Sequence, residues 1–316
     1  MGDDTDVPKR VNPYLSVVVP TFRMGGLDVL VDGLRGQEFR DFELVLVDCV
    51  MAYRPDVFKG FTDFPVRHVD PIRNPFPVAS FCRCANTGLG HARGEVVVMV
   101  TDYTWLPPGC LARHAAFHRA RPTVGHDVLL CPHEYASHPP PGALFPGYGR
   151  EDIDDYVQDL RDGVLEGFGW SLSDSQFSGG ARALPPDLPH GVHGSDHVPR
   201  DPKLDMSPGF VEPHFFHGKN ASARKDLLIF TGGWNEAFDG GHGYQDTEFA
   251  WRLAYRAGAF FHLELEDPAV IVNPRHHFPW LRQERDVHGN EEIWRALEAQ
   301  DYPEPGPFFP RQEWDG

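Results

Sequence analysis

Three apolar runs in the first third of the chain constrain its fold most strongly. They are Tyr14–Pro20 (YLSVVVP), Phe42–Asp48 (FELVLVD) and Val96–Val100, within GEVVVMVTDYTWLPP. A continuous run of valine and leucine is typical of a strand that is covered on both faces, as in a parallel sheet. Segments with helical spacing, Leu27–Leu34 and Ser80–His91, lie between these runs. Strands that alternate with helices predict βαβ units, so we predict an α/β fold with a mostly parallel sheet flanked by helices.

The predicted strands carry acidic residues at their carboxyl ends. Asp48 closes the second run, and Asp102 follows the third run two residues after Val100. Pro107 and Pro108 then prevent any continuation of the strand, because proline cannot donate to a ladder. In open α/β sheets, ligands bind outside the carboxyl ends of the strands. We therefore expect Asp48 and Asp102 at a ligand-binding edge.

The second half of the chain is less regular. Asp246–Ala257 is the clearest helix, and we also predict a helix at Ala221–Phe230 and a strand at Ala259–Leu265. Between residues 130 and 215 the sequence is rich in glycine, proline, histidine and aspartate, with one possible helix at Glu151–Leu165. Loops of this length in a compact domain are typically functional lids or disordered segments, so we interpret this stretch as an irregular insertion.

Composition limits the class of protein. The 316 residues are 41% apolar and carry a formal net charge of −17, which argues against a surface that binds nucleic acid throughout. No apolar run reaches the length of a membrane span, and MGDDTDVPKR lacks the apolar core of a signal peptide, so we expect a soluble, cytoplasmic protein. The five cysteines lack zinc-ligand spacing, although Cys82 and Cys84 are close together, and we predict free, buried thiols.

Four stretches together resemble a known family. They are VVVPTFRM, FELVLVD, ANTGLGHARGEVVVMVTDYTWLPP and GGWNEAFDGGHGYQDTEFAWRLAYRAGA, and GKNASARKDLLIF adds to them. In this order and spacing they resemble the inverting family 2 glycosyltransferases, which have the Rossmann-like GT-A fold. The resemblance implies that a sugar moves from a nucleotide-diphosphate donor to a hydroxyl acceptor. The acceptor is unknown and would be a glycan, a protein, a small molecule or, less favoured by the net charge, modified DNA.

The resemblance also divides the chain into segments. We expect a loose N-terminus at 1–13, a nucleotide-sugar-binding half at 14–125, an insertion or lid at 126–214, an acceptor-binding and catalytic half at 215–300, and a tail at 301–316.

Six residues match the part of the family that binds the donor: Pro20, Thr21, Asp48, Arg83, Asn86 and Asp102. A carboxylate at the position of Asp48 can accept from a base N–H or a ribose hydroxyl. The family usually has a second acidic residue there, whereas this chain has Cys49. Arg83 is placed to reach a phosphate. The structural alternatives are a solvated aspartate at a strand end for Asp48 and a plain helix interior for Asn86.

The metal-binding motif departs from the family pattern. The family has Asp-x-Asp after the third strand, whereas this chain has Thr101 and Tyr103 at the two usual positions and Asp102 between them. Carboxylate oxygens suit Mn²⁺ or Mg²⁺, and such a metal would offset charge on the departing diphosphate. One carboxylate binds a divalent ion weakly, so Asp102 needs a partner.

Two adjacent histidines are candidates for that partner. His276 and His277 follow the last apolar segment, and in several GT-A enzymes a histidine from this region completes the metal site. Imidazole with carboxylate is a normal ligand set for Mn²⁺. Two alternatives remain open: the pair lies in a surface turn, or Arg275 or Lys219 supplies positive charge in place of a metal.

The catalytic assignments come from GYQDTEFAWRL. The resemblance assigns Asp246 as the general base, with Glu248 in reserve, and places Gln245 and Trp234 against the acceptor. An aspartate at a helix N-terminus is favoured in its ionised form, which suits a base, but it is also a common N-cap. Trp234 serves equally well as a core residue, and Arg252 has the spacing to pair with Glu248.

Three other functions remain compatible with this sequence. A degenerate GT-A domain would bind a sugar nucleotide or glycan without turnover. The absence of aspartate at the two usual positions of the Asp-x-Asp motif favours this alternative. A nucleotidyltransferase shares the parallel sheet and the metal but needs no base on a second-half helix. A glycosyltransferase that modifies DNA would require a local basic groove.

Overall fold

The computed structural model describes residues 12–21, 27–49, 51–53, 55–71, 81–102, 104–121, 126–136, 207–241, 243–272 and 285–299. The predicted helix at Glu151–Leu165 lies outside these residues.

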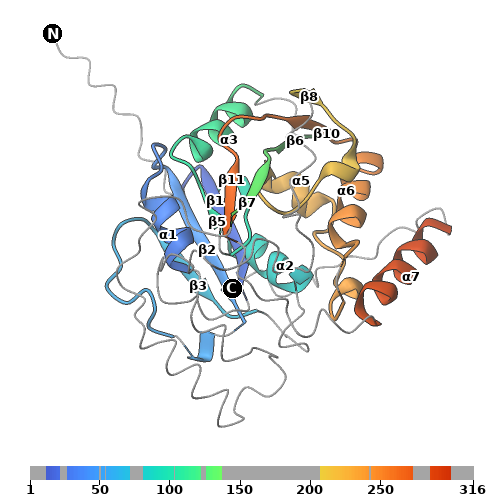
Figure 1. The fold of residues 1–316 in the computed structure, drawn as a ribbon, viewed down its shortest axis with the longest axis horizontal. Coiled ribbons are helices and arrows are strands. Elements are labelled where there is room, and N and C mark those ends of the chain that lie inside the picture. The colour runs from blue at the N-terminus through green and yellow to red at the C-terminus, as the bar shows by residue number, and fades with distance from the viewer. Residues whose placement is uncertain are drawn as a thin grey trace, which may run out of the picture.

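A sheet of eight strands forms the centre of the described structure (Figure 1). Its order is β3 (Val66–Val69), β2 (Phe42–Asp48), β1 (Leu15–Thr21), β4 (Val96–Met99), β9 (Ala221–Arg224), β6 (Asp127–Leu130), β10 (Phe260–Leu263) and β8 (Gly209–Phe210). Four neighbouring pairs are parallel, and β9 and β8 run antiparallel to their neighbours. The predicted α/β class with a mostly parallel sheet is confirmed.

Helices cover both faces of this sheet. On one face α2 (Phe81–His91), α5 (Lys225–Phe230) and α6 (Gln245–Tyr255) share a core cluster with β1, β2, β4, β6 and β9. On the other face α1 (Leu27–Arg35) and α3 (Cys110–Arg119) pack against alternate residues of β1, β2 and β4. The continuous apolar runs of the sequence thus reflect burial on both faces.

Smaller elements complete the fold. A three-stranded sheet has the order β5 (Thr104–Trp105), β11 (Ala269–Val272) and β7 (His133–Ala136). The 3-10 turns are η1 (Met51–Tyr53), η4 (Pro213–Phe215) and η5 (Glu236–Phe238), and α7 (Arg285–Ala299) lies against η5. None of the helices in the described residues is long and apolar enough to span a bilayer.

The prediction of one helix at Ala221–Phe230 is wrong in its first part. Ala221–Arg224 forms β9, which pairs with β4 on one side and with β6 on the other, and the helix begins at Lys225. These small residues lie buried between two strands, so tertiary pairing overrides their weak strand propensity.

Parallel strand direction brings distant residues to one edge. Six strands of the large sheet point the same way, so their carboxyl ends share an edge. Thr21 and Asp48 end two of these strands, in register with one another, and Asp102 follows a third. Because β9 runs in the opposite direction, the residues that precede Ala221 reach the same edge. We call this the carboxyl edge.

Candidate functional site

Three of the residues predicted to bind the sugar donor lie close together at the carboxyl edge. Thr21 Oγ1 donates to Asp102 Oδ2 at 3.0 Å, and His68 Nε2 donates to Asp48 Oδ2 at 2.7 Å. Thr21, Asp48 and Asp102 are buried, at 0%, 0% and 2% exposed. Asp48 is therefore not a solvated strand end. His68 was missed by the sequence analysis; its only signal was a polar residue within the short strand VRHV.

A small cavity links this edge to the second half of the chain. Pro20, Val100, Gly218 and Trp234 are among the residues that line it. Its volume of about 10 Å³ leaves room for at most one water, so it holds neither a sugar nor a nucleotide. The cavity shows that the ends of β1 and β4 lie close to the segment that precedes β9.

Asp246 lies next to Gly218, one of the residues that line this cavity. A Cβ atom built on Gly218 would lie 3.3 Å from Asp246 Oδ1 and 3.3 Å from Phe81 Cζ. Asp246 is in the first turn of α6, but the N-cap is Tyr244, so the N-cap alternative for Asp246 is wrong. Segments that are far apart in sequence thus bring Asp246 close to the carboxyl edge.

Asp246 and its neighbour Gln245 carry polar atoms without partners. Asp246 Oδ1 and Gln245 Oε1 are buried and have no hydrogen-bond partner within the described residues. Buried polar atoms are almost always paired, because an unpaired one costs roughly 1–3 kcal/mol. The unpaired carboxylate oxygen at the start of α6 therefore makes Asp246 a candidate for contact with a ligand.

Glu248 does not suit its predicted reserve role as a base. It is 0% exposed, and Arg252 donates to both of its oxygens, at 2.6 Å from Nε and 2.7 Å from Nη2. The predicted pairing of Arg252 with Glu248 is confirmed. Arg252 also donates to the carbonyl oxygens of Thr231 and Gly233, both at 2.7 Å. Glu248 therefore orients Arg252 and is not available to a substrate.

Arg83 and Asn86 contact the second half of the chain. Asn86 is 2% exposed, donates to Trp234 O at 2.9 Å and accepts from Trp234 N at 2.8 Å. Arg83 Nη2 donates to Glu236 Oε2 at 2.6 Å. Both side chains fasten α2 to the segment 234–239, which fits the structural alternative of a helix interior for Asn86, whereas a donor contact of Arg83 stays a prediction.

The same segment caps α2. Asp239 accepts from the backbone N–H groups of Cys82 and Arg83, at 2.8 and 3.0 Å, in the first turn of the helix. Burial raises the pKa of Asp239 to about 7, against the opposing effect of those two donors. This carboxylate was not singled out from the sequence, because its partners lie more than 150 residues away.

Trp234 belongs to the core. It is 2% exposed, and its ring stacks on Phe249 with centroids 4.1 Å apart and contacts Phe81 edge-on. The interpretation of Trp234 as an open platform for the acceptor is therefore wrong. Its Nε1 atom is buried and has no hydrogen-bond partner among the described residues.

The described residues do not form a metal site. No group of three histidine, cysteine or acidic side chains within the described ranges is placed to hold an ion. Asp102 offers one carboxylate, which already accepts from Thr21. His276, His277 and Arg275 lie outside the described residues. A metal at Asp102 with either histidine therefore stays a prediction.

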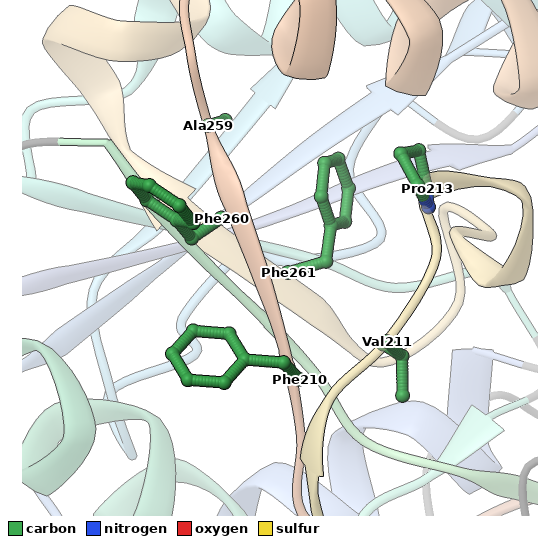
Figure 2. A pocket seen from close by; sticks show the side chains of 6 residues that line it. All are labelled: Phe210, Val211, Pro213, Ala259, Phe260 and Phe261. Carbon is green, nitrogen blue, oxygen red and sulfur yellow. The ribbon is translucent and has the colours of Figure 1, made fainter.

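An open apolar groove lies elsewhere, where β8 meets β10 (Figure 2). Its lining residues are Phe210, Val211, Pro213, Ala259, Phe260 and Phe261. None of these side chains is polar, so the groove offers no group for proton or phosphate chemistry.

Comparison with known proteins identifies solved structures with a similar fold. No family model and no curated protein matches the sequence. Among solved structures, the chain is similar to S. aureus TarS residues 1–349, with a TM-score of 0.52 and 14% identity over 93% of this chain and 67% of that one. TarS 1–349 in complex with UDP-GlcNAc gives a TM-score of 0.51 and 16% identity, over 84% of this chain and 60% of that one. At this identity the likeness shows the fold alone, which is a glycosyltransferase fold.

Proposed function

We propose that this protein is an inverting glycosyltransferase of the family 2 type, which moves a sugar from a nucleotide-diphosphate donor to a hydroxyl acceptor. The observation that carries the proposal is the unpaired, buried Asp246 Oδ1 at the start of α6, beside Gly218 and the carboxyl edge. The fold shared with TarS, which was crystallised with UDP-GlcNAc, supports a nucleotide sugar as donor and makes UDP-sugars the first candidates.

Asp246 acts as the general base in this proposal. The free N–H groups and the dipole at the start of α6 place partial positive charge near its carboxylate. Its free oxygen accepts the proton of the acceptor hydroxyl as that oxygen attacks the anomeric carbon. The nucleotide diphosphate leaves from the opposite side of the sugar, so the anomeric configuration inverts. General base catalysis of this kind contributes about 10²–10⁴-fold to a rate.

The donor binds at the carboxyl edge. Thr21, Asp48 and Asp102 are the residues that we assign to it, with Pro20 ending the strand beside them. The hydrogen bond from Thr21 to Asp102 and the one between His68 and Asp48 hold these groups in fixed positions before the donor arrives. A divalent ion at Asp102, completed by His276 or His277, is a separate hypothesis on which the base assignment does not depend.

The test is transfer from a panel of UDP-sugars, measured as release of nucleoside diphosphate with and without a mixed acceptor set. Asp246→Asn should lower the rate about 10²–10⁴-fold at unchanged donor affinity. The matched control is Asp226→Asn, an exposed aspartate in the first turn of α5, which should leave the rate unchanged. Full activity of a folded Asp246→Asn variant would show that the base assignment is wrong.

Two further readouts separate the alternative functions. Tight UDP-sugar binding without release of nucleoside diphosphate would indicate a binding domain without turnover, and release of pyrophosphate would indicate a nucleotidyltransferase. Assays with EDTA and then with Mn²⁺ or Mg²⁺ test the metal. Loss of activity with EDTA in the wild type, restored by Mn²⁺, supports the metal hypothesis, and activity that EDTA leaves unchanged rejects it.

A further inference from the structure

Two of the five cysteines form a close pair beneath the carboxyl edge. Cys49 directly follows β2, and Cys84 lies in the second turn of α2. Their Sγ atoms are 3.3 Å apart. Cys49 is held in place by its backbone N–H, which donates to Thr21 O at 2.9 Å. The pair therefore joins the strand that ends in Asp48 to the helix that packs beneath the sheet edge.

The two thiols differ in access. Cys49 is partly exposed, whereas Cys84 is 1% exposed. None of the five cysteines of the chain forms a disulfide. A disulfide needs its sulfur atoms about 2.05 Å apart. The two Sγ atoms, now 3.3 Å apart, must therefore move about 1.25 Å closer for the bond to form.

We propose that Cys49 and Cys84 form a dithiol modification site, which low-molecular-weight disulfides convert into an intramolecular disulfide. The thiolate of Cys49 attacks one sulfur of the reagent, forms a mixed disulfide and expels the first thiolate. The thiolate of Cys84 then attacks Cys49 Sγ and expels the second. Two protons leave the protein, and the two electrons reduce one reagent disulfide to two thiols.

The order of these steps follows from exposure and charge. The reagent reaches Cys49 first because Cys49 is partly exposed, whereas Cys84 is buried. The pKa of the Cys84 thiol lies well above its ordinary value. The hydrogen bond between Cys84 and Cys49 raises it most, burial raises it next, and the charges of Asp239 and Cys82 act in the same direction. Ring closure is therefore the slow step, and it accelerates as the pH rises.

The modification has a local consequence at the donor site. A bond between Cys49 and Cys84 ties the residue after Asp48 to α2 and draws the end of β2 toward the helix. We expect the disulfide form to bind UDP more weakly than the dithiol form. This consequence rests on the proposed function, whereas formation of the disulfide does not.

The experiment treats the folded, full-length protein with oxidised glutathione at pH 8.5. The expected product has lost the mass of two hydrogen atoms, its titratable thiols in denaturant fall from five to three, and a peptide map contains a Cys49–Cys84 crosslink. Dithiothreitol should restore all five thiols. Below pH 7 the glutathione adduct at Cys49 should accumulate before the ring closes.

The matched controls lie on the same helix. Cys82 and Cys84 are both 1% exposed, but the contact with Cys49 is made by Cys84. Cys84→Ala should stop the reaction at the glutathione adduct, whereas Cys82→Ala should still form the crosslink. Cys49→Ser, a change at the more exposed position, should prevent both products.

Two results would overturn the proposal. One is a protein that keeps five titratable thiols, or a stable glutathione adduct, at pH 8.5. The other is a crosslink that maps to a different pair of cysteines. Binding of UDP to both forms is measured separately by calorimetry. If the crosslink forms but the dithiol form binds no UDP, the modification site is supported and only the proposed donor site is contradicted.

Discussion

The buried ion pair between Glu248 and Arg252 allows a sharp test of what holds α6 in place. Both side chains are 0% exposed, and Arg252 directs four hydrogen bonds to the Glu248 carboxylate and to the carbonyl oxygens of Thr231 and Gly233. Arg252→Met keeps most of the length of the side chain and removes its charge. It leaves a buried carboxylate and two carbonyl oxygens without their donor.

The expected cost follows from that loss. Removing one partner of a buried ion pair costs about 3–5 kcal/mol, because the remaining charge stays buried and uncompensated. The chain contains a matched pair, Glu291 and Arg295, with the same spacing of four residues on α7 but with Arg295 72% exposed. Pairs of that kind contribute about 0–1 kcal/mol. Arg295→Met should therefore have little effect on stability.

Urea unfolding followed by circular dichroism measures both variants. We expect Arg252→Met to lower the unfolding midpoint strongly at unchanged slope, and Arg295→Met to leave it near the wild-type value. The double variant Glu248→Leu/Arg252→Met should recover part of the loss, since it buries no unpaired charge. A loss below about 1 kcal/mol for Arg252→Met would refute the reasoning, because it would place the buried pair in the same class as the exposed one.

Two further predictions concern α2 and α3, the helices that pack on opposite faces of the sheet. Burial lowers the pKa values of His114 and His118 to about 4 and about 3, so both are neutral in the folded state, and unfolding at lower pH takes up their protons. Stability should thus be full above about pH 6.5 and fall as the pH drops toward 4, by up to about 1.4 kcal/mol per pH unit for each ring, and His118→Gln should make urea midpoints less dependent on pH. A Cβ atom on Gly88 would lie 2.4 Å from Val18 Cγ1, so Gly88→Ala should cost about 1–3 kcal/mol in urea unfolding. Gly36→Ala, whose Cβ would meet nothing closer than 3.6 Å, should be nearly neutral, and equal effects of the two substitutions would contradict this packing argument.

The central strands could be predicted because their cause is local. Burial on both faces selects a continuous run of valine and leucine, and β1, β2 and β4 each show one. Strand β9 has no such run, since ASAR is polar at two of its four positions. It becomes a strand because β4 and β6 lie on either side of it and offer their backbone groups. That pairing joins residues far apart in the sequence, and no local pattern encodes it.

The same distinction explains which candidate residues the sequence could place at one edge of the sheet. Thr21, Asp48 and Asp102 follow from strand ends, and parallel strands bring such ends together whatever the rest of the chain does. For Arg83 and Asn86 the family resemblance indicated donor contacts, and the sequence did not reveal their partners within the protein. Their partners lie about 150 residues further along, so position within a family pattern alone suggested a ligand.

Arg83 and Asn86 instead explain how the proposed base is held against the donor edge. Helix α2 packs on β1 and β2, and its polar side chains hold the segment that begins at Trp234. Arg252 binds the residues just before that segment, Thr231 and Gly233, from within α6. Polar contacts thus run from α2, which packs on the sheet, through the segment 231–236 to the helix whose first turn carries the proposed base. A general base must stay within hydrogen-bond reach of the acceptor hydroxyl, and displacement by about 1 Å can cost about a hundredfold in rate. In the proposed reaction, the residues first assigned to the donor therefore act on the base, as the contacts that fix its position.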